Sequence, residues 1–480
     1  MRPAPTLVAL AALVVLPLSA PALVPAGGGL EAGLASVRTE SLSADLHFLA
    51  DDALAGRDTP SEGLRFAARF IRARLQRLGF EPGAGESYFH VYHLERKPLD
   101  LERTHAVVVR GDDERRLAWG ADMWVHPRRF DEGESRGPVV FCGEGSEADF
   151  AELDLAGKWA FCHDVRLPWY ARMRSARDAG ALGVLVARPA DYPGRSYAEE
   201  YASWRDEAGG GRLGLPGDGG RPSFAYTRLS PDAAAALLGD AKPAVGDDLG
   251  VTYAEARVAV EPERFEVENV CGFWPGSDPE LAKEVLIVSA HYDHVGTSDE
   301  GIFNGADDNG SGTTGLLGLA EALAAYGPMR RSVLLIWVSG EEKGLLGSRA
   351  WARAPTLPEG HRAVANLNID MIGRNAPDKL RITPSAEHEE YNGLTRVAER
   401  FAPLEGFPAL PSADEYWSRS DHASFSEELD IPVAFLFADI HDDYHRPTDT
   451  AEKIDYDKIR RVTRLVLRML DGLQTDELEL

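Results

Sequence analysis

The feature that most constrains the fold is an alternation of apolar strands and helices that begins near residue 265 and continues towards the C-terminus. Apolar runs such as EVLIVSA, SVLLIWVS and AVANLNID are separated by helical stretches such as TTGLLGLAEALAAY. Such alternation is typical of folds in which helices cover a parallel sheet. The sequence therefore predicts an α/β sandwich with a largely parallel sheet in this region.

The chain is too long for one ordinary core. Its 480 residues predict two structured units plus processing segments. Residues 40–95 include an amphipathic helix, with apolar residues at helical spacing from Leu64 to Leu78 and Gly79 as its stop. From about 100 to 255 the chain has short β-like runs, Gly-rich loops and no catalytic cluster, which favours a separate domain.

The N-terminus has the pattern of a secretory signal peptide. Arg2 precedes a short apolar run, and Ala20-Pro21-Ala22 resembles a cleavage site. A membrane anchor is disfavoured because Pro17 and Pro21 interrupt the run. We expect residues 1–22 to be a signal peptide and the protein to be exported to the periplasm or the medium, without stable membrane association.

The composition of the chain limits the kinds of molecule and metal site that we expect. A formal net charge of −26 argues against nucleic acid, because phosphate binding needs a concentrated Lys/Arg surface. The three cysteines have spacings that match neither a thiolate zinc site nor a dense disulfide framework. They allow at most one disulfide, for which Cys142 and Cys162 are the favoured pair.

Polar clusters recur where strands of the alternating region end. They are AHYDH at 290–294, NGADDNGSG at 304–312, SGEEKG at 339–344, NIDMIGR at 368–374 and DDYHRPTDT at 442–450. Each alone is more simply a turn or a helix cap. Together, at strand ends where α/β sheets gather ligands, they predict a metal site of histidine and carboxylate donors, suited to zinc, manganese or cobalt.

Other hydrolase and nucleotide motifs are missing. The sequence has no H-E-x-x-H, no G-x-S-x-G in this region and no G-x-x-x-x-G-K loop. The segment SRSDHASF, residues 418–425, contains Ser, Asp and His too close together for a catalytic triad, so we expect it to form a pocket wall.

These motifs resemble, in their order, the aminopeptidase Y family of co-catalytic dizinc exopeptidases, some of which carry an inserted protease-associated domain. LADDALAGRDTPSEG resembles that family's N-terminal segment, and LDLAGKWAFCHDV resembles the insert. The resemblance implies a three-layer sandwich with a mostly parallel mixed sheet (the zinc exopeptidase fold) plus a β-rich insert. The implied divisions are residues 40–100 and 256–480 for the catalytic domain and 101–255 for the protease-associated domain.

The resemblance also implies roles for individual residues. His291 and Asp370 would bind one zinc, Glu342 and His445 the other, and Asp308 would bridge the two. Glu341 would be the general base and Asp293 would orient His291, as carboxylates behind a metal ligand do. Tyr444 would donate its hydroxyl to the developing oxyanion.

The leading expectation is a secreted dizinc aminopeptidase that acts on peptides. Two metals can share one carboxylate and activate a water, while one of two adjacent glutamates stays free to move its proton. A carboxypeptidase or glutaminyl cyclase on the same fold, and a non-catalytic receptor-like homologue, are the alternatives. The sequence does not indicate the oligomeric state.

Overall fold

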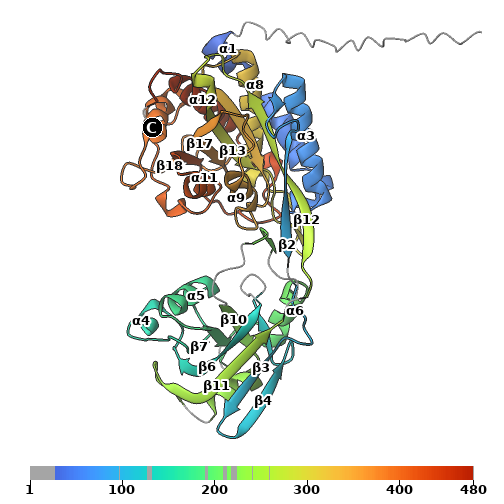
Figure 1. Ribbon diagram of the computed structural model, residues 1–480, viewed down its shortest axis with the longest axis vertical. Coiled ribbons are helices and arrows are strands. Elements are labelled where there is room, and N and C mark those ends of the chain that lie inside the picture. The colour runs from blue at the N-terminus through green and yellow to red at the C-terminus, as the bar shows by residue number, and fades with distance from the viewer. Residues whose placement is uncertain are drawn as a thin grey trace, which may run out of the picture.

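The computed structural model describes residues 28–478 except 97, 127–131, 190–192, 209–212, 218–223, 240–241 and 259, so the predicted signal peptide lies outside the described residues. Two lobes follow one another along the long axis of the molecule (Figure 1). Among the described residues, no helix has both the length and the apolar character needed to cross a membrane.

The first lobe is built on a mixed sheet with the order β18-β19-β17-β13-β16-β12-β2-β9, and β1 also pairs with β12. Strands β16, β13, β17 and β19 run parallel at its centre, whereas the pairs at both edges are antiparallel. The bounds are β1 Glu81–Pro82, β2 Phe89–Arg96, β9 Leu213–Gly214, β12 Glu263–Trp274, β13 Glu284–His291, β16 Ser332–Val338, β17 Arg362–Asp370, β18 Arg381–Thr383 and β19 Val433–Phe437. The predicted mixed sheet is confirmed, with its parallel pairing confined to the centre.

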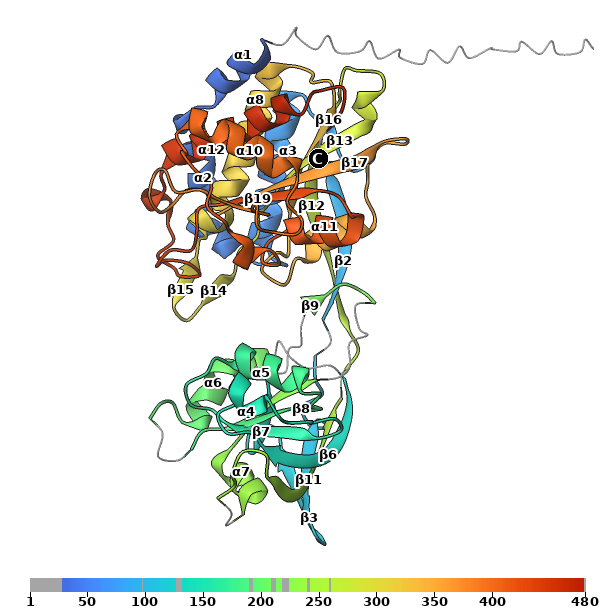
Figure 2. The same cartoon turned by 90° about the vertical axis from the view of Figure 1, so that its left-hand side faces the viewer.

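Helices cover both faces of this sheet (Figure 2). On β13, Leu286 and Val288 pack into one core, and Val285 and Ile287 pack into another, because side chains alternate along a strand. The first core includes side chains of α1, α2, α3, α8, α10 and α12; the second includes those of α9 and α11. The helices are α1 Gly29–Ser36, α2 Thr39–Leu49, α3 Glu62–Leu78, α8 Gly312–Tyr326, α9 Leu346–Arg353, α10 Gly393–Phe401, α11 His422–Leu429 and α12 Tyr456–Gly472. The arrangement is the expected three-layer sandwich.

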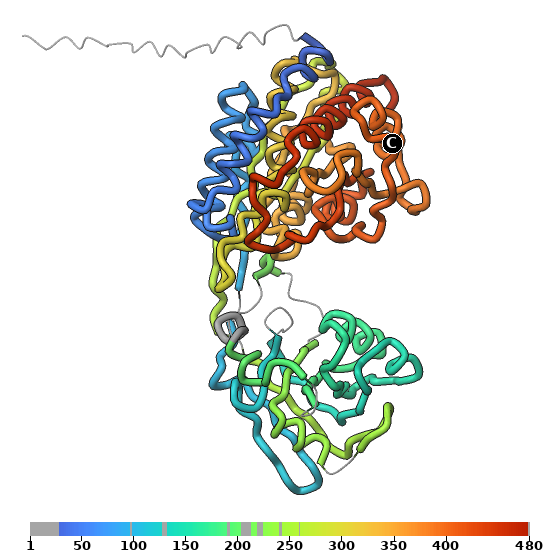
Figure 3. Tube along the Cα trace, turned by 180° about the vertical axis from the view of Figure 1, so that it is seen from behind, coloured from blue at the N-terminus to red at the C-terminus, as the bar shows by residue number. Residues whose placement is uncertain are grey.

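Helix α3 forms as the sequence predicted. The Ser61 hydroxyl caps its N-terminus by accepting from the Leu64 amide, and Gly79, with φ +84°, ends it. Ile71 and Leu75 are fully buried against the first core. Helix α1, at the start of the described chain, lies beside α12 on the same face of the sheet (Figure 3). There Arg464 of α12 donates to the carbonyl of Leu34 at 3.3 Å.

The second lobe contains an eight-stranded sheet with the order β4-β3-β11-β6-β7-β8-β10-β5. Strands β2 and β12, paired from Phe89–Val270 to Arg96–Glu263, lead to and from it. Its strands are β3 His105–Arg110, β4 Asp113–Ala118, β5 Met123–Val125, β6 Gly133–Phe141, β7 Trp159–His163, β8 Gly183–Ala187, β10 Ala225–Leu229 and β11 Asp248–Arg257, and its helices are α4 Glu147–Phe150, α5 Trp169–Asp178, α6 Tyr197–Ala208 and α7 Pro231–Leu238.

Two details differ from the sequence expectations. Strand β9 falls inside the predicted insert but pairs with β2 of the first lobe. Cys142 and Cys162 are buried neighbours, yet both are free thiols, so the predicted disulfide is wrong. Burial and the adjoining Cys142 raise the pKa of the Cys162 thiol well above its usual range, which keeps it protonated.

Candidate metal centre

The predicted ligands converge at one edge of the first sheet, where the parallel strands end. His291 and Asp370 are the last residues of β13 and β17, and the Glu341-Glu342 pair follows β16. Asp308 lies just before α8, and His445 lies in the loop between β19 and α12. Residues up to 154 positions apart are brought together by this topology.

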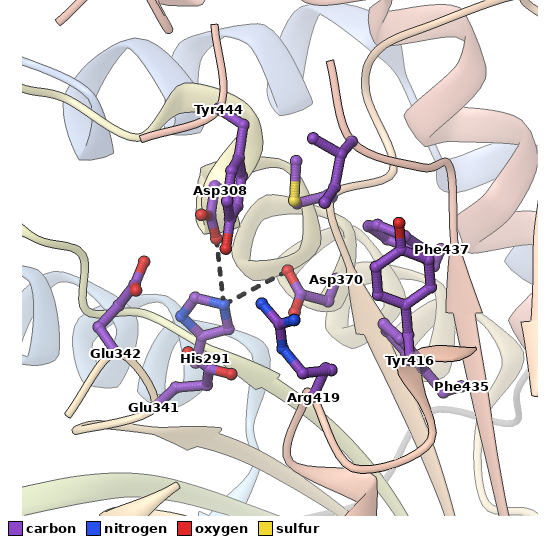
Figure 4. A pocket seen from close by; sticks show the side chains of 12 residues that line it. His291, Asp308, Glu341, Glu342, Asp370, Tyr416, Arg419, Phe435, Phe437 and Tyr444 are labelled. Carbon is purple, nitrogen blue, oxygen red and sulfur yellow. Dashed lines mark ion pairs between the residues drawn. The ribbon is translucent and has the colours of Figure 1, made fainter. Parts of the chain in front are cut away.

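Asp308 stands between the two histidines. Its Oδ1 is 3.4 Å from His291 Nε2, and its Oδ2 is 3.1 Å from His445 Nε2. On one side Asp370 Oδ1 is 3.3 Å from His291 Nε2, and on the other Glu342 Oε2 is 3.2 Å from His445 Nε2. Figure 4 shows Asp308 and Asp370 both directed at the His291 ring. The two oxygens of Asp308 therefore face two separate donor groups.

The spacing of these atoms fits a pair of divalent ions. Three buried atoms make no hydrogen bond of suitable geometry with any described residue: His445 Nε2, Asp370 Oδ1 and Glu342 Oε1. Their neighbours lie at about the 3.4 Å that separates two donors on a tetrahedral ion with bonds of about 2.1 Å. Donor atoms of His294, Asp308, Glu342 and His445 lie within 4.8 Å of one another, as do those of His291, Glu341 and Asp370. Imidazole and carboxylate donors of this kind suit two Zn²⁺ ions.

The turn before α8 decides which of its residues can bridge. The Asp307 carboxylate accepts from the Gly373 amide at 2.7 Å. The Asn309 side-chain oxygen accepts from the amides of Gly312, at 2.8 Å, and Met371, at 3.2 Å. Both side chains thus fasten the turn to the end of β17. Asp308, the residue predicted as the bridge, is the one left facing the histidines.

The two adjacent glutamates have opposite electrostatics. Burial is the main cause that raises the pKa of Glu341 well above its usual range, and the carboxylate of Glu342 adds to it. Burial also acts on Glu342, but the close imidazoles of His294 and His445 outweigh it and lower the pKa of Glu342 to about 2. One glutamate therefore stays an anion that suits a cation, while the other can accept and release a proton.

Asp293 links three parts of the site. Its backbone oxygen lies 3.2 Å from His291 Nδ1, whereas its carboxylate oxygen is 3.6 Å away. The carboxylate accepts instead from the Thr59 hydroxyl at 3.0 Å and the Glu341 amide at 3.2 Å. The Thr59 hydroxyl accepts from the Gly340 amide at 3.1 Å. Asp293 is therefore placed to position both His291 and the Glu341 turn.

The ligand atoms open into a pocket. Besides the metal-ligand candidates, its wall consists of Met371, Tyr416, Arg419, Phe435, Phe437, Ile440 and Tyr444 (Figure 4). The wall residues are mostly apolar or aromatic. All the lining residues fall between 291 and 444, so the pocket is built by the first lobe.

The expected pocket-wall role of SRSDHASF is correct only for Arg419, since Asp421 and His422 are buried beneath it. Tyr444 lines the pocket with its ring stacked on His445 at 3.9 Å between centroids. Burial and the nearby carboxylates of Asp308 and Glu342 raise the pKa of Tyr444, so its hydroxyl keeps the proton it would need to donate.

Sequence reasoning missed two residues. Arg57, buried in the N-terminal segment, donates to the carbonyls of Tyr292 at 2.9 Å, Asn304 at 2.7 Å and Gly305 at 3.0 Å. It therefore ties the end of β13 to the turn that carries Asp308. His294, part of the quoted AHYDH motif, joins the donor group around Glu342. Its spacing from His291 was visible in the sequence, but which way its ring points was not.

Comparison with known proteins identifies the unit that carries the site. Residues 269–470, which contain all the ligand candidates, match peptidase family M28. This part of the chain is similar to peptidase family M28. Aminopeptidase YwaD of Bacillus subtilis (strain 168) is 25% identical over 337 residues, covering 68% of this chain and 65% of the relative. A probable leucine aminopeptidase of Arthroderma benhamiae is 31% identical over 201 residues, covering 39% of this chain and 54% of the relative. The chain thus spans between about half and two thirds of these curated relatives.

Solved structures of similar fold align over most of the chain. An aminopeptidase from Aneurinibacillus sp. strain AM-1 aligns over 92% of this chain and 95% of its own, with a TM-score of 0.57 and 21% identity. BSAP, a zinc aminopeptidase from Bacillus subtilis, aligns over 91% and 95%, with a TM-score of 0.52 and 20% identity. At this identity the match supports the fold.

Proposed function

We propose that this protein is a dizinc aminopeptidase that releases N-terminal residues from peptides. The observation that carries the proposal is the placement of Asp308 between two histidine-carboxylate groups, beside the buried Glu341, whose pKa is raised well above its usual range. The names of the M28 relatives, aminopeptidase and zinc aminopeptidase, support the same assignment.

The residues divide the work as follows. His291 and Asp370 would hold one ion, Glu342 and His445 would hold the other, and Asp308 would contribute to both. Zinc, when bound, lowers the pKa of a water and polarises a carbonyl. Glu341 takes the proton of the attacking water and passes it to the leaving amine. Asp293 positions His291 and the Glu341 turn, and the Tyr444 hydroxyl donates to the oxyanion that forms on the substrate.

The pocket wall indicates the kind of residue that is released. Phe435, Phe437 and Met371 present an apolar surface beside the ligands, which suits an apolar side chain at the peptide's N-terminus. The carboxylates of Glu341 and Asp370 lie on the metal side of the pocket, where they can hold the free amine. We expect leucine-like N-terminal residues to be preferred.

The test uses zinc-loaded protein with Leu-p-nitroanilide and its N-acetylated counterpart. The proposal requires hydrolysis of the free amine alone, and a Glu341→Gln variant that keeps two metal ions per chain but loses activity by about 10²-fold or more. Release from neither substrate, with metal bound, would contradict an aminopeptidase.

One observation favours the carboxypeptidase alternative as a second candidate. The exposed guanidinium of Arg419 reaches into the pocket (Figure 4) and could hold a C-terminal carboxylate. Hippuryl-type substrates with a blocked amine and a free carboxylate separate the two activities. An Arg419→Gln variant should cleave such substrates less efficiently only if the carboxypeptidase assignment is correct.

We further propose that the protein is exported and that its second lobe is a protease-associated insert that filters substrates by size. The motif at residues 1–22 and the resemblance of LDLAGKWAFCHDV support these assignments. Fractionation of expressing cells, with N-terminal sequencing of the mature protein, tests export. Mature protein that still begins at Met1 in the cytoplasm would contradict it.

A further inference from the structure

His294 is the one member of the donor groups to which no role has been given above. It follows β13 three residues after His291, and its side chain is fully buried. Its Nδ1 lies 2.9 Å from Glu342 Oε1 and 3.8 Å from Asp308 Oδ2. Its ring stands edge-on to that of His445, with centroids 5.5 Å apart. The ring thus faces the same point as three of the predicted ligands.

Hydrogen bonding does not explain this position. Neither ring nitrogen of His294 makes a hydrogen bond of suitable geometry within the described part of the chain, and Glu342 Oε1 lacks one too. A buried polar group without a partner is costly, so such groups usually have a partner such as an ordered water or an ion. A donor nitrogen and an acceptor oxygen that face one point without bonding each other fit a cation between them.

The surrounding chain holds the ring in place. The His294 amide donates to the carbonyl of Arg57 at 3.1 Å, and Arg57 is itself bonded to three further carbonyls around the site. On the other side Gly305, with φ +56°, passes so close that a Cβ there would lie 2.5 Å from His294 Cγ. The backbone of Arg57 and Gly305 therefore holds the imidazole of His294 with its Nδ1 facing Glu342.

We propose that His294 Nδ1 is a fourth protein ligand of the metal ion held by Asp308, Glu342 and His445. The inference rests on the proposed metal centre and deepens it, because the two ions then have unequal surroundings. One has four protein donors and approaches a closed site, whereas the other has His291, Asp308 and Asp370 and keeps an open position for substrate. The closed ion is retained and the open one exchanges.

A zinc-loaded crystal structure tests the ligand directly and needs no substitution. The expected result is His294 Nδ1 at about 2.0–2.1 Å from the ion beside Glu342. A ring nitrogen more than about 3 Å from the ion, hydrogen-bonded to Glu342, would make His294 a positioning residue and overturn the proposal. Two bound ions in that outcome would leave the proposed function standing, whereas no bound zinc would overturn both.

Metal retention tests the consequence. Zinc-loaded protein is dialysed against increasing dipicolinate, and metal per chain is measured. The wild type should lose its ions in two separate steps. His294→Phe keeps a ring without nitrogens. In this variant the dipicolinate concentration at which the second ion is lost should fall by about 100-fold or more, towards that of the first ion. His90→Phe, which replaces a buried histidine outside the centre, should retain both steps. A His294→Phe profile equal to that of the wild type would refute the fourth ligand.

Discussion

At the scale of single residues, the site depends on side chains that touch no substrate. Thr59 is fully buried, and its hydroxyl donates to Asp293 and accepts from the Gly340 amide. Thr59→Val removes both bonds while keeping the shape, and leaves a buried amide without a partner, which costs about 1–3 kcal/mol. We expect kcat on Leu-p-nitroanilide to fall by about 10-fold or more with little change in KM. Thr59→Ser should restore it, and wild-type kcat in the valine variant would contradict the role of this bond.

His422 makes a separate prediction about pH. Burial lowers its pKa to about 3. The pKa of His422 in the folded protein lies below its usual value of about 6.5. The contribution of the neutral imidazole to folding stability is therefore fully present above pH 6.5 and is lost as the pH falls towards 3. His422→Phe, which keeps the ring that stacks on Phe435 at 4.6 Å, should remove this dependence.

The measurement is urea unfolding of metal-free protein at pH 7 and pH 4.5. Between pH 7 and pH 4.5, the free energy of unfolding of His422→Phe should rise by about 2–3 kcal/mol relative to that of the wild type. His93→Phe, at an exposed position, serves as the control and should follow the wild type. Parallel pH slopes for wild type and His422→Phe would show that the buried imidazole is not the titrating group.

At the scale of elements, α3 anchors the N-terminal segment that supplies Arg57 and Thr59. Ile71 is fully buried against the first core, whereas Phe66 on the same helix is 51% exposed. Ile71→Ala should destabilise the lobe by about 2–5 kcal/mol, and Phe66→Ala by about 0.5 kcal/mol or less. Equal effects in thermal or urea unfolding would mean that α3 does not pack as described.

The elements could largely be predicted because their signals are local. Apolar runs identified β13, β16 and β17, and helical spacing of apolar residues with Gly79 as the stop identified α3. The antiparallel edges could not be predicted, since pairing of β2 with β12 joins residues more than 150 positions apart. Arg57 was missed for the same reason: its three partners around the site lie 235 to 248 residues away, and no local pattern reports such a contact.

At the scale of the whole molecule, the pocket and the second lobe are separate. Every lining residue comes from the first lobe. Strands β2 and β12 carry the chain between the two lobes, and β9 returns from the insert to pair with β2. Each lobe also has its own buried cores, so each is expected to fold as a unit. Cleavage of a small substrate should therefore not need the second lobe.

Excision of the second lobe tests this. Arg96 and Glu263 are directly opposed in the β2–β12 ladder, so an Asn-Gly turn between them can close a hairpin in place of residues 97–262. The deletion also removes the short edge strand β9, which pairs with β2 but contributes no residue to the pocket. We expect the shortened protein to bind two zinc ions and to cleave Leu-p-nitroanilide with unchanged kcat/KM. If the insert filters substrates, the ratio of the cleavage rate of long peptides to that of dipeptides should be higher for the shortened protein than for the full chain. Loss of small-substrate activity in a folded, zinc-loaded variant would instead make the second lobe part of the catalytic unit.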